Sequence, residues 1–156
     1  MKTKIALSLA TVLALATPAV AQSAYTSFAL GATDAGSASL ALRWHSVPHD
    51  RGWSWAAGIW ATTDRSAWIG GGVSYTLRPG NGNVFVRGSF MPGLYARGNG
   101  RDLGGALEFA TGVEVGTELR NGAQVSLLLE HRSNAGIYSN NPGVNALSVV
   151  YSMPLN

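Results

Sequence analysis

The chain has 156 residues, of which 46% are hydrophobic and only 12% are charged, and its formal net charge is +3. Two of the 11 basic residues lie in the first four positions, so the rest of the chain has nearly balanced charge, which argues against a nucleic-acid-binding surface. There is no cysteine and the three histidines are scattered, which excludes a disulfide framework and a clustered metal site. We expect no metal and no organic cofactor.

The N-terminal segment has the pattern of a secretory signal peptide. Lys2 and Lys4 precede an apolar stretch, and Ala19-Val20-Ala21 forms an A-x-A cleavage site. We therefore predict a signal peptide at residues 1–21 and a single domain at residues 22–156. After the signal, no apolar stretch approaches the roughly 18 residues of a membrane-spanning helix. That excludes a helical membrane protein but leaves a β-barrel open, since a barrel strand needs only about 9–11 residues.

The remaining sequence has a strand–turn rhythm that predicts an all-β fold of eight strands. In chain order, we expect strands at residues 25–32, 39–46, 53–62, 67–78, 83–95 and 106–119, a seventh that contains residues 125–129, and an eighth at 145–153. Turn signals separate them, of which Pro79-Gly80-Asn81-Gly82 and Asn121-Gly122 are the strongest.

A soluble β-sandwich would also alternate polar and apolar residues, but two features favour an outer-membrane barrel. The fourth, fifth and sixth strands are about 11–14 residues long, which exceeds the usual 5–6 residues of strands in globular sheets. Tight turns alternate with longer polar loops, as in outer-membrane barrels, whose short turns are periplasmic. We predict an eight-stranded antiparallel barrel in the bacterial outer membrane.

The charged residues of the strands share one face, which in a small barrel is an interior filled by side chains. The residues expected there are Arg43, Arg87, Glu108, Glu114, Glu118 and Glu130. On the opposite, lipid-facing surface we expect tryptophans in the interface girdles, namely Trp53, Trp55, Trp60 and Trp68.

The seventh strand ends in a pattern that suggests catalysis. Side chains alternate along a strand, so His131 and Ser133 share one face, with Cα atoms roughly 7 Å apart. A base beside a hydroxyl is the minimal apparatus of nucleophilic catalysis. The pair shares its face with Leu127 and Leu129, so it points towards lipid, and acyl esters of lipid A are the substrate class available there.

The motif His131-Arg132-Ser133-Asn134-Ala135-Gly136, followed by Asn141-Pro142-Gly143, resembles the signature of the PagL-type lipid A 3-O-deacylases, also called the acyloxyacyl hydrolase family. The resemblance implies a hydrolase that removes an ester-linked acyl chain of lipopolysaccharide. It also implies Ser133 as nucleophile and His131 as general base, with Asn134, Ala135 and Gly136 forming or supporting the oxyanion hole.

One position departs from the family pattern. Well-known members carry a glutamate at the start of the last strand that orients the histidine, and the matching residue here is Asn145. An amide oxygen can accept a hydrogen bond from His131 but brings no negative charge. Two readings follow: a slow deacylase in which Asn145 completes the triad, or a non-catalytic barrel of the same fold with a structural or surface-interaction role. Expected partners are lipopolysaccharide and outer-membrane lipids, and a homodimer is left open.

Overall fold

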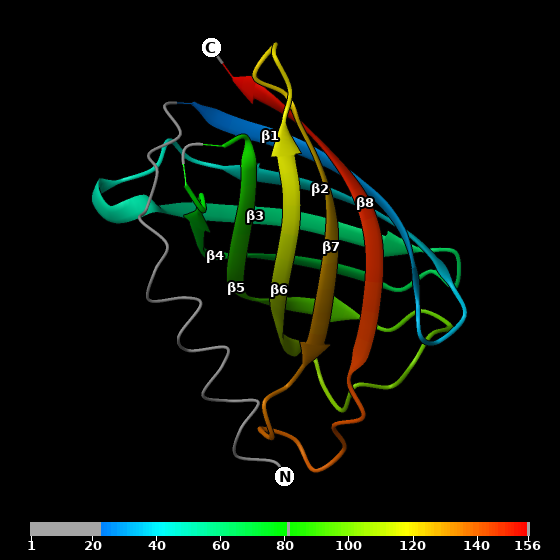
Figure 1. The fold of residues 1–156 in the computed structure, drawn as a ribbon. Coiled ribbons are helices and arrows are strands. Elements are labelled where there is room, and N and C mark those ends of the chain that lie inside the picture. Colours follow the sequence, from blue (N-terminus) through cyan, green and yellow to red (C-terminus); the bar gives the residue numbers. More distant parts are fainter. Residues whose placement is uncertain (1–22, 81, 156) are drawn as a thin grey trace, which may run out of the picture.

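The computed structural model describes residues 23–80 and 82–155, so the predicted signal peptide lies outside it. Within these residues, each strand pairs antiparallel with the next, and the last pairs with the first to close a barrel (Figure 1). Its elements are β1 (Ala24–Thr33), β2 (Ala38–His45), the short 3-10 helix η1 (Asp50–Gly52), β3 (Trp53–Thr62), β4 (Ala67–Leu77), β5 (Val84–Ala96), β6 (Leu107–Glu118), β7 (Gln124–Ser133) and β8 (Val144–Leu155).

The predicted eight-stranded barrel is thus confirmed, and each strand boundary given above lies within two residues of the observed one. No helix among the described residues is long and apolar enough to cross a membrane.

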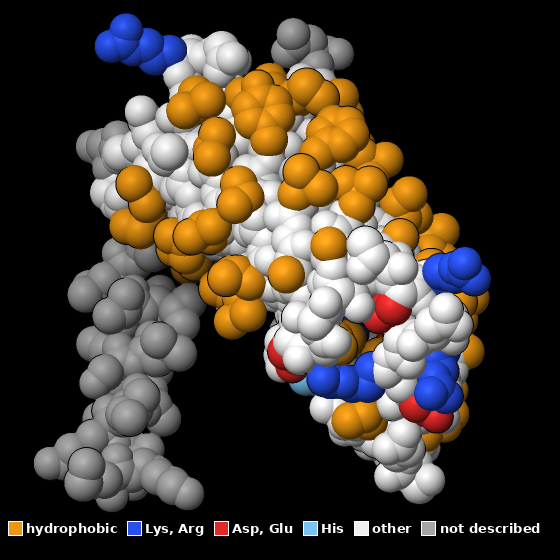
Figure 2. All heavy atoms as spheres, turned by 90° about the vertical axis from the view of Figure 1, so that its right-hand side faces the viewer, with side chains coloured by type: hydrophobic (Ala, Val, Ile, Leu, Met, Phe, Trp, Pro, Cys, Tyr) orange, Lys and Arg blue, Asp and Glu red, His pale blue; other side chains and the backbone are white. Residues whose placement is uncertain are grey.

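The outer wall of the barrel is apolar. On β2, for example, Leu40, Leu42 and Trp44 are exposed while the intervening residues are buried, as the alternation of a strand requires. Figure 2 shows hydrophobic side chains spread over this wall, with most of the visible charged side chains toward its lower end and a basic side chain projecting at the top. An exposed apolar band of this extent is the expected surface of a barrel that faces lipid.

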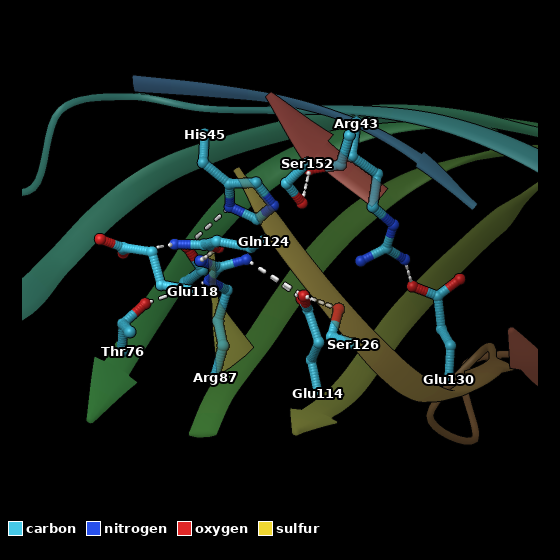
Figure 3. A network of polar contacts seen from close by, with 12 residues as sticks. Arg43, His45, Thr76, Arg87, Glu114, Glu118, Gln124, Ser126, Glu130 and Ser152 are labelled. Carbon is cyan, nitrogen blue, oxygen red and sulfur yellow. Dashed lines mark hydrogen bonds and ion pairs between the residues drawn. The ribbon is translucent and has the colours of Figure 1, made fainter. Parts of the chain in front are cut away.

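The interior holds the charged residues, as predicted. Arg87 donates to Glu114 at 3.2 Å and to Gln124 at 2.8 Å, and Ser126 donates to Glu114 at 2.6 Å. Figure 3 shows these side chains converging inside the barrel. A second cluster lies around Glu130, which pairs with both Arg43 and Arg132. Buried charges are tolerated when they are paired in this way.

The girdle prediction is wrong for two of the four tryptophans. Trp60 and Trp68 are buried inside the barrel, where the guanidinium of Arg132 lies over both indole rings. A cation held over an indole face is attracted by the negative charge of the ring face. The two tryptophans therefore stabilise the buried charge of Arg132 without a further carboxylate. Trp55 does face outward, near Trp53, at the end of the barrel where β1 starts and β8 ends.

Candidate active site

The predicted catalytic pair lies at the C-terminal end of β7, at the end of the barrel opposite the start of β1 and the end of β8. His131 and Ser133 are two residues apart on the outward face, with the buried Arg132 between them. Across the sheet, His131 pairs with Asn145 on β8, and Ser133 pairs with Phe109 on β6. The barrel register therefore places the three predicted catalytic residues on one patch of the outer wall.

A hydrogen bond of 2.8 Å joins Nδ1 of His131 to Oδ1 of Asn145. An amide oxygen only accepts hydrogen bonds, so Nδ1 must carry the proton. In the neutral ring, Nε2 is then unprotonated and free to take a proton. This arrangement gives His131 the tautomer that a general base next to a serine needs.

Asn145 is itself held by a residue from the opposite end of the chain. Its Nδ2 donates to Oδ2 of Asp34 at 2.7 Å, and its backbone N–H donates to Oδ1 of Asp34 at 3.2 Å. The backbone N–H of Asp34 donates in return to the carbonyl of Asn145 at 2.9 Å. Asp34 lies just after β1, which pairs with β8, so barrel closure brings the two residues together.

Partial burial opposes ionisation of the Asp34 carboxyl, but the hydrogen bonds from Asn145 and the positive charge of Arg101 outweigh it and lower its pKa. Arg101, from the loop between β5 and β6, donates to Oδ1 of Asp34 at 3.1 Å and to the carbonyl of Gly143 at 2.9 Å. Asp34 is therefore a carboxylate at neutral pH, and it is fixed from two sides.

The turn that follows Ser133 is tight. Ala135 and Gly136 both have left-handed backbone angles, with φ of 54° and 82°. The buried side chain of Asn134 organises the turn: its Nδ2 donates to the carbonyls of Leu103 at 2.6 Å and Asn140 at 2.8 Å, and its Oδ1 accepts from the N–H of Gly136 at 2.9 Å. The amide of Asn134 is thus fully used in holding the loop.

Gly143 leaves room for the histidine ring. A Cβ atom at this position would lie 2.6 Å from Cε1 and 3.1 Å from Nε2 of His131. The residue also has φ of 65°, a conformation that glycine adopts without strain. The backbone of Gly143 therefore packs directly against the edge of the ring that carries Nε2.

Comparison with known proteins now gives the family. The family model described as "Lipid A 3-O-deacylase (PagL)" matches residues 21–154. The chain belongs to the PagL family. Among solved structures, the outer-membrane enzyme PagL is similar with a TM-score of 0.72 at 21% identity, over 84% of this chain and 99% of that one.

A de novo designed transmembrane β-barrel is similar with a TM-score of 0.60 at 10% identity, over 88% of this chain and 99% of that one. At such identities these likenesses concern the fold. No curated protein sequence matches the chain significantly. Membership of the PagL family, together with the closed eight-stranded barrel, makes this chain an outer-membrane lipid A deacylase.

The sequence of this PagL-family chain points to the site residues of β7 and β8 but not to Asp34 and Arg101. The segment Thr33-Asp34-Ala35-Gly36 has the composition of a turn, and turn chemistry accounts for an aspartate there. A signal was present in the register: closing an eight-stranded sheet sets the end of the first strand beside the start of the last. The contact between Asp34 and Asn145 can be predicted only if the register of β1 against β8 is known for each residue.

Proposed function

We propose that the protein hydrolyses the ester-linked 3-O-acyl chain of lipid A by a serine–histidine mechanism on the lipid-facing wall of the barrel. The observation that carries this proposal is the hydrogen bond from Nδ1–H of His131 to Asn145, which leaves Nε2 as a base on the same outward face as Ser133. The family's description as 3-O-deacylases supports the choice of ester.

The proposed reaction has two halves. Oγ of Ser133 attacks the ester carbonyl carbon while Nε2 of His131 takes the hydroxyl proton, giving a tetrahedral oxyanion. The C–O bond to the sugar then breaks, and His131 returns the proton to the leaving sugar oxygen. In the second half, His131 takes a proton from water as the water oxygen bonds to the acyl carbon, the bond from that carbon to Oγ of Ser133 breaks, and His131 returns the proton to Oγ, which releases the fatty acid and free Ser133.

The surroundings of Ser133 suit an acyl chain. Its partner in the sheet, Phe109, stacks on Phe90 with ring centroids 5.6 Å apart, so an aromatic surface flanks the nucleophile on the β5–β6 side. We place this end of the barrel at the cell surface, with both termini periplasmic, so that the site meets the outer leaflet. Lipopolysaccharide can then reach Ser133 sideways, without leaving the membrane.

For the oxyanion we assign the backbone N–H of Ala135. Of the three residues predicted to form or support the hole, Asn134 and Gly136 use their N–H groups inside the turn, donating to Asn141 at 3.0 Å and to Asn134 at 2.9 Å. The N–H of Ala135 donates to no residue within 23–80 and 82–155. Asn134 and Gly136 then act as supports that aim this donor.

Mass spectrometry of lipid A tests the proposal. Cells that express the wild-type protein should lose one hydroxyacyl mass from lipid A, at the 3-O position, and cells that express the Ser133→Ala variant should not. Equal amounts of folded protein in the outer membrane serve as the control. Unchanged lipid A with both proteins would point instead to the non-catalytic barrel, and loss of a different acyl chain would refute the 3-O assignment.

A further inference from the structure

We propose that Asp34 is a positioning residue of this active site, and that it supplies through Asn145 the carboxylate that the third triad position lacks. The inference rests on the proposed function and adds a fourth member to its catalytic chain: Asp34, Asn145, His131 and Ser133.

The geometry of Asp34 fixes which way the Asn145 amide points. An ionised carboxylate only accepts hydrogen bonds, so the amide edge 2.7 Å from Oδ2 of Asp34 must be the NH₂ group. The carbonyl edge of Asn145 is then the one that meets His131. The backbone N–H of Asn145, which donates to the other oxygen of Asp34, keeps the carboxylate in place.

The direction of the amide decides the tautomer of the histidine. If the Asn145 amide turned over, its NH₂ group would face Nδ1 of His131, and Nδ1 would have to accept. The proton would then sit on Nε2, where it blocks proton removal from Ser133. In a serine protease, the wrong histidine tautomer lowers kcat about 10⁴-fold. Asp34 is the group that disfavours this arrangement.

The same contact brings negative charge near the site. When His131 takes the proton of Ser133 its ring becomes positive, and the Asp34 carboxylate lies one amide group away. Arg101 offsets part of that charge, but its hydrogen bonds to Asp34 and to the Gly143 carbonyl also hold the carboxylate against the last strand. A fixed carboxylate stabilises the transition state more than a mobile one, because it needs no rearrangement during the reaction.

The chain of hydrogen bonds from Asp34 to His131 predicts that two single substitutions each impair the site and that their combination restores it. The Asn145→Asp variant would set two carboxylates against each other at a contact that is now 2.7 Å, and the two cannot both ionise at that distance. The Asp34→Asn variant removes the charge and allows either amide to turn over. Combining both changes moves the carboxylate next to His131 and places the amide behind it, so every hydrogen bond can form again.

The experiment is therefore a double-mutant cycle on purified protein in detergent with lipid A as substrate. We expect Asp34→Asn and Asn145→Asp each to lower kcat, on the order of 10- to 100-fold, with KM changed less than about twofold, and the double variant to recover wild-type kcat or exceed it. Glu118→Gln is the matched control, because Glu118 is another partly exposed carboxylate that pairs with an arginine, Arg78, and it lies at the opposite end of the barrel from the site. It should leave kcat unchanged.

A purely structural role for Asp34 predicts another result. Losses in kcat would then follow losses in thermal stability, and the double variant would be no better than its worse parent. Either finding, or wild-type kcat in Asp34→Asn, would overturn the proposal.

Nitrogen NMR of the histidine ring gives a readout that does not depend on turnover. The wild-type protein should show His131 with the proton on Nδ1, and Asp34→Ala should shift the population towards the Nε2–H form. A His131→Asn variant identifies the signals against those of His45 and His49. An unchanged tautomer in Asp34→Ala would overturn the positioning role. Unchanged lipid A with the wild-type protein would instead count against the deacylase proposal alone.

Discussion

The guanidinium of Arg132 lies 4.0 Å from the ring centroid of Trp60 and 5.3 Å from that of Trp68, inside the barrel wall whose outer side carries His131 and Ser133. Arg132 also pairs with Glu130. The strand between the two site residues is thus anchored inward by a buried cation. This contact fixes the end of β7, and with it the separation and direction of the two outward side chains.

Replacing Arg132 by alanine should destabilise the barrel. The change empties space between two indole rings and leaves Glu130 with Arg43 alone, so we expect the free energy of unfolding to fall by about 3 kcal/mol. Urea titration in detergent micelles, followed by tryptophan fluorescence, measures this. The Arg97→Ala variant removes an exposed pair and should cost less than about 1 kcal/mol. Equal losses in both variants would contradict the anchoring role.

Asn134→Asp should open the loop between β7 and β8. The substitution keeps the shape of the side chain but replaces the NH₂ group, which donates to two carbonyls, by a carboxylate oxygen that those carbonyls repel. The buried charge and lost donors should weaken the loop by about 3 kcal/mol. Limited proteolysis with a nonspecific protease should cut the loop faster, and deacylation should slow on the order of 100-fold.

The matched control for that change is Asn121→Asp, at the opposite end of the barrel. Asn121 uses its Oδ1 to accept from the N–H of Ala123 at 3.2 Å, and a carboxylate accepts equally well. Proteolysis and deacylation should therefore stay at wild-type rates. If Asn134→Asp behaved like this control, the side chain of Asn134 would not be holding the loop.

Gly143→Ala should lower kcat by displacing the His131 ring. The added Cβ would meet Cε1 at 2.6 Å, so the ring must move away from the position that faces Asn145. We expect a loss of about 10- to 100-fold, as for other small displacements of catalytic groups. Gly80→Ala is the control: Gly80 has nearly the same φ, 67°, and an added Cβ would meet nothing within 4 Å. Gly80→Ala should introduce the same backbone strain without a steric clash, and the variant should keep full activity.

Asp64 should make stability depend on pH. Burial alone would raise the pKa of its carboxyl, but hydrogen bonds donated by Ser37, Thr62 and Ser66 hold that pKa well below its usual range. A lowered pKa in the folded state means that the carboxylate stabilises the fold above its unfolded-state pKa and loses this effect as pH falls through the folded-state pKa. Asp64→Asn should therefore lower stability by about 1–2 kcal/mol at pH 7.

That difference should shrink progressively below about pH 4. Urea titrations of the wild type and Asp64→Asn at pH 7 and pH 3 measure it. A difference that is the same at both pH values would mean that the carboxylate charge of Asp64 is not the cause.

The fold was predictable because the alternation of strands is local information. Residues i and i+2 share a face whatever the rest of the barrel does, so the placement of Arg87 and Glu114 inside and of Leu127 and Leu129 outside followed from the sequence alone. The turn signals set the strand boundaries in the same local way.

The error about Trp60 and Trp68 went against the same local rule, because both residues are out of phase with the outward-facing Trp55 and Ile69 and therefore point inward. The omissions concern contacts that no local pattern contains, such as the packing of these two rings on Arg132. Asp34 and Asn145 lie 111 positions apart in the chain, and their contact depends on the register between β1 and β8. The hydrogen bond from Asn134 to the carbonyl of Leu103 was equally hidden, because Leu103 lies on another loop.

The pairing of β1 with β8 also determines at which stage of barrel folding the site residues come together. Ser133, His131 and Asn145 belong to the last two strands, whereas Asp34 follows the first, so the set assembles only when the two ends of the sheet meet. A chain that has not yet closed carries the serine and histidine side by side without the carboxylate that directs them. If Asp34 directs His131 as proposed, ester hydrolysis should become efficient only in the closed barrel, so that the onset of activity would report the last step of assembly.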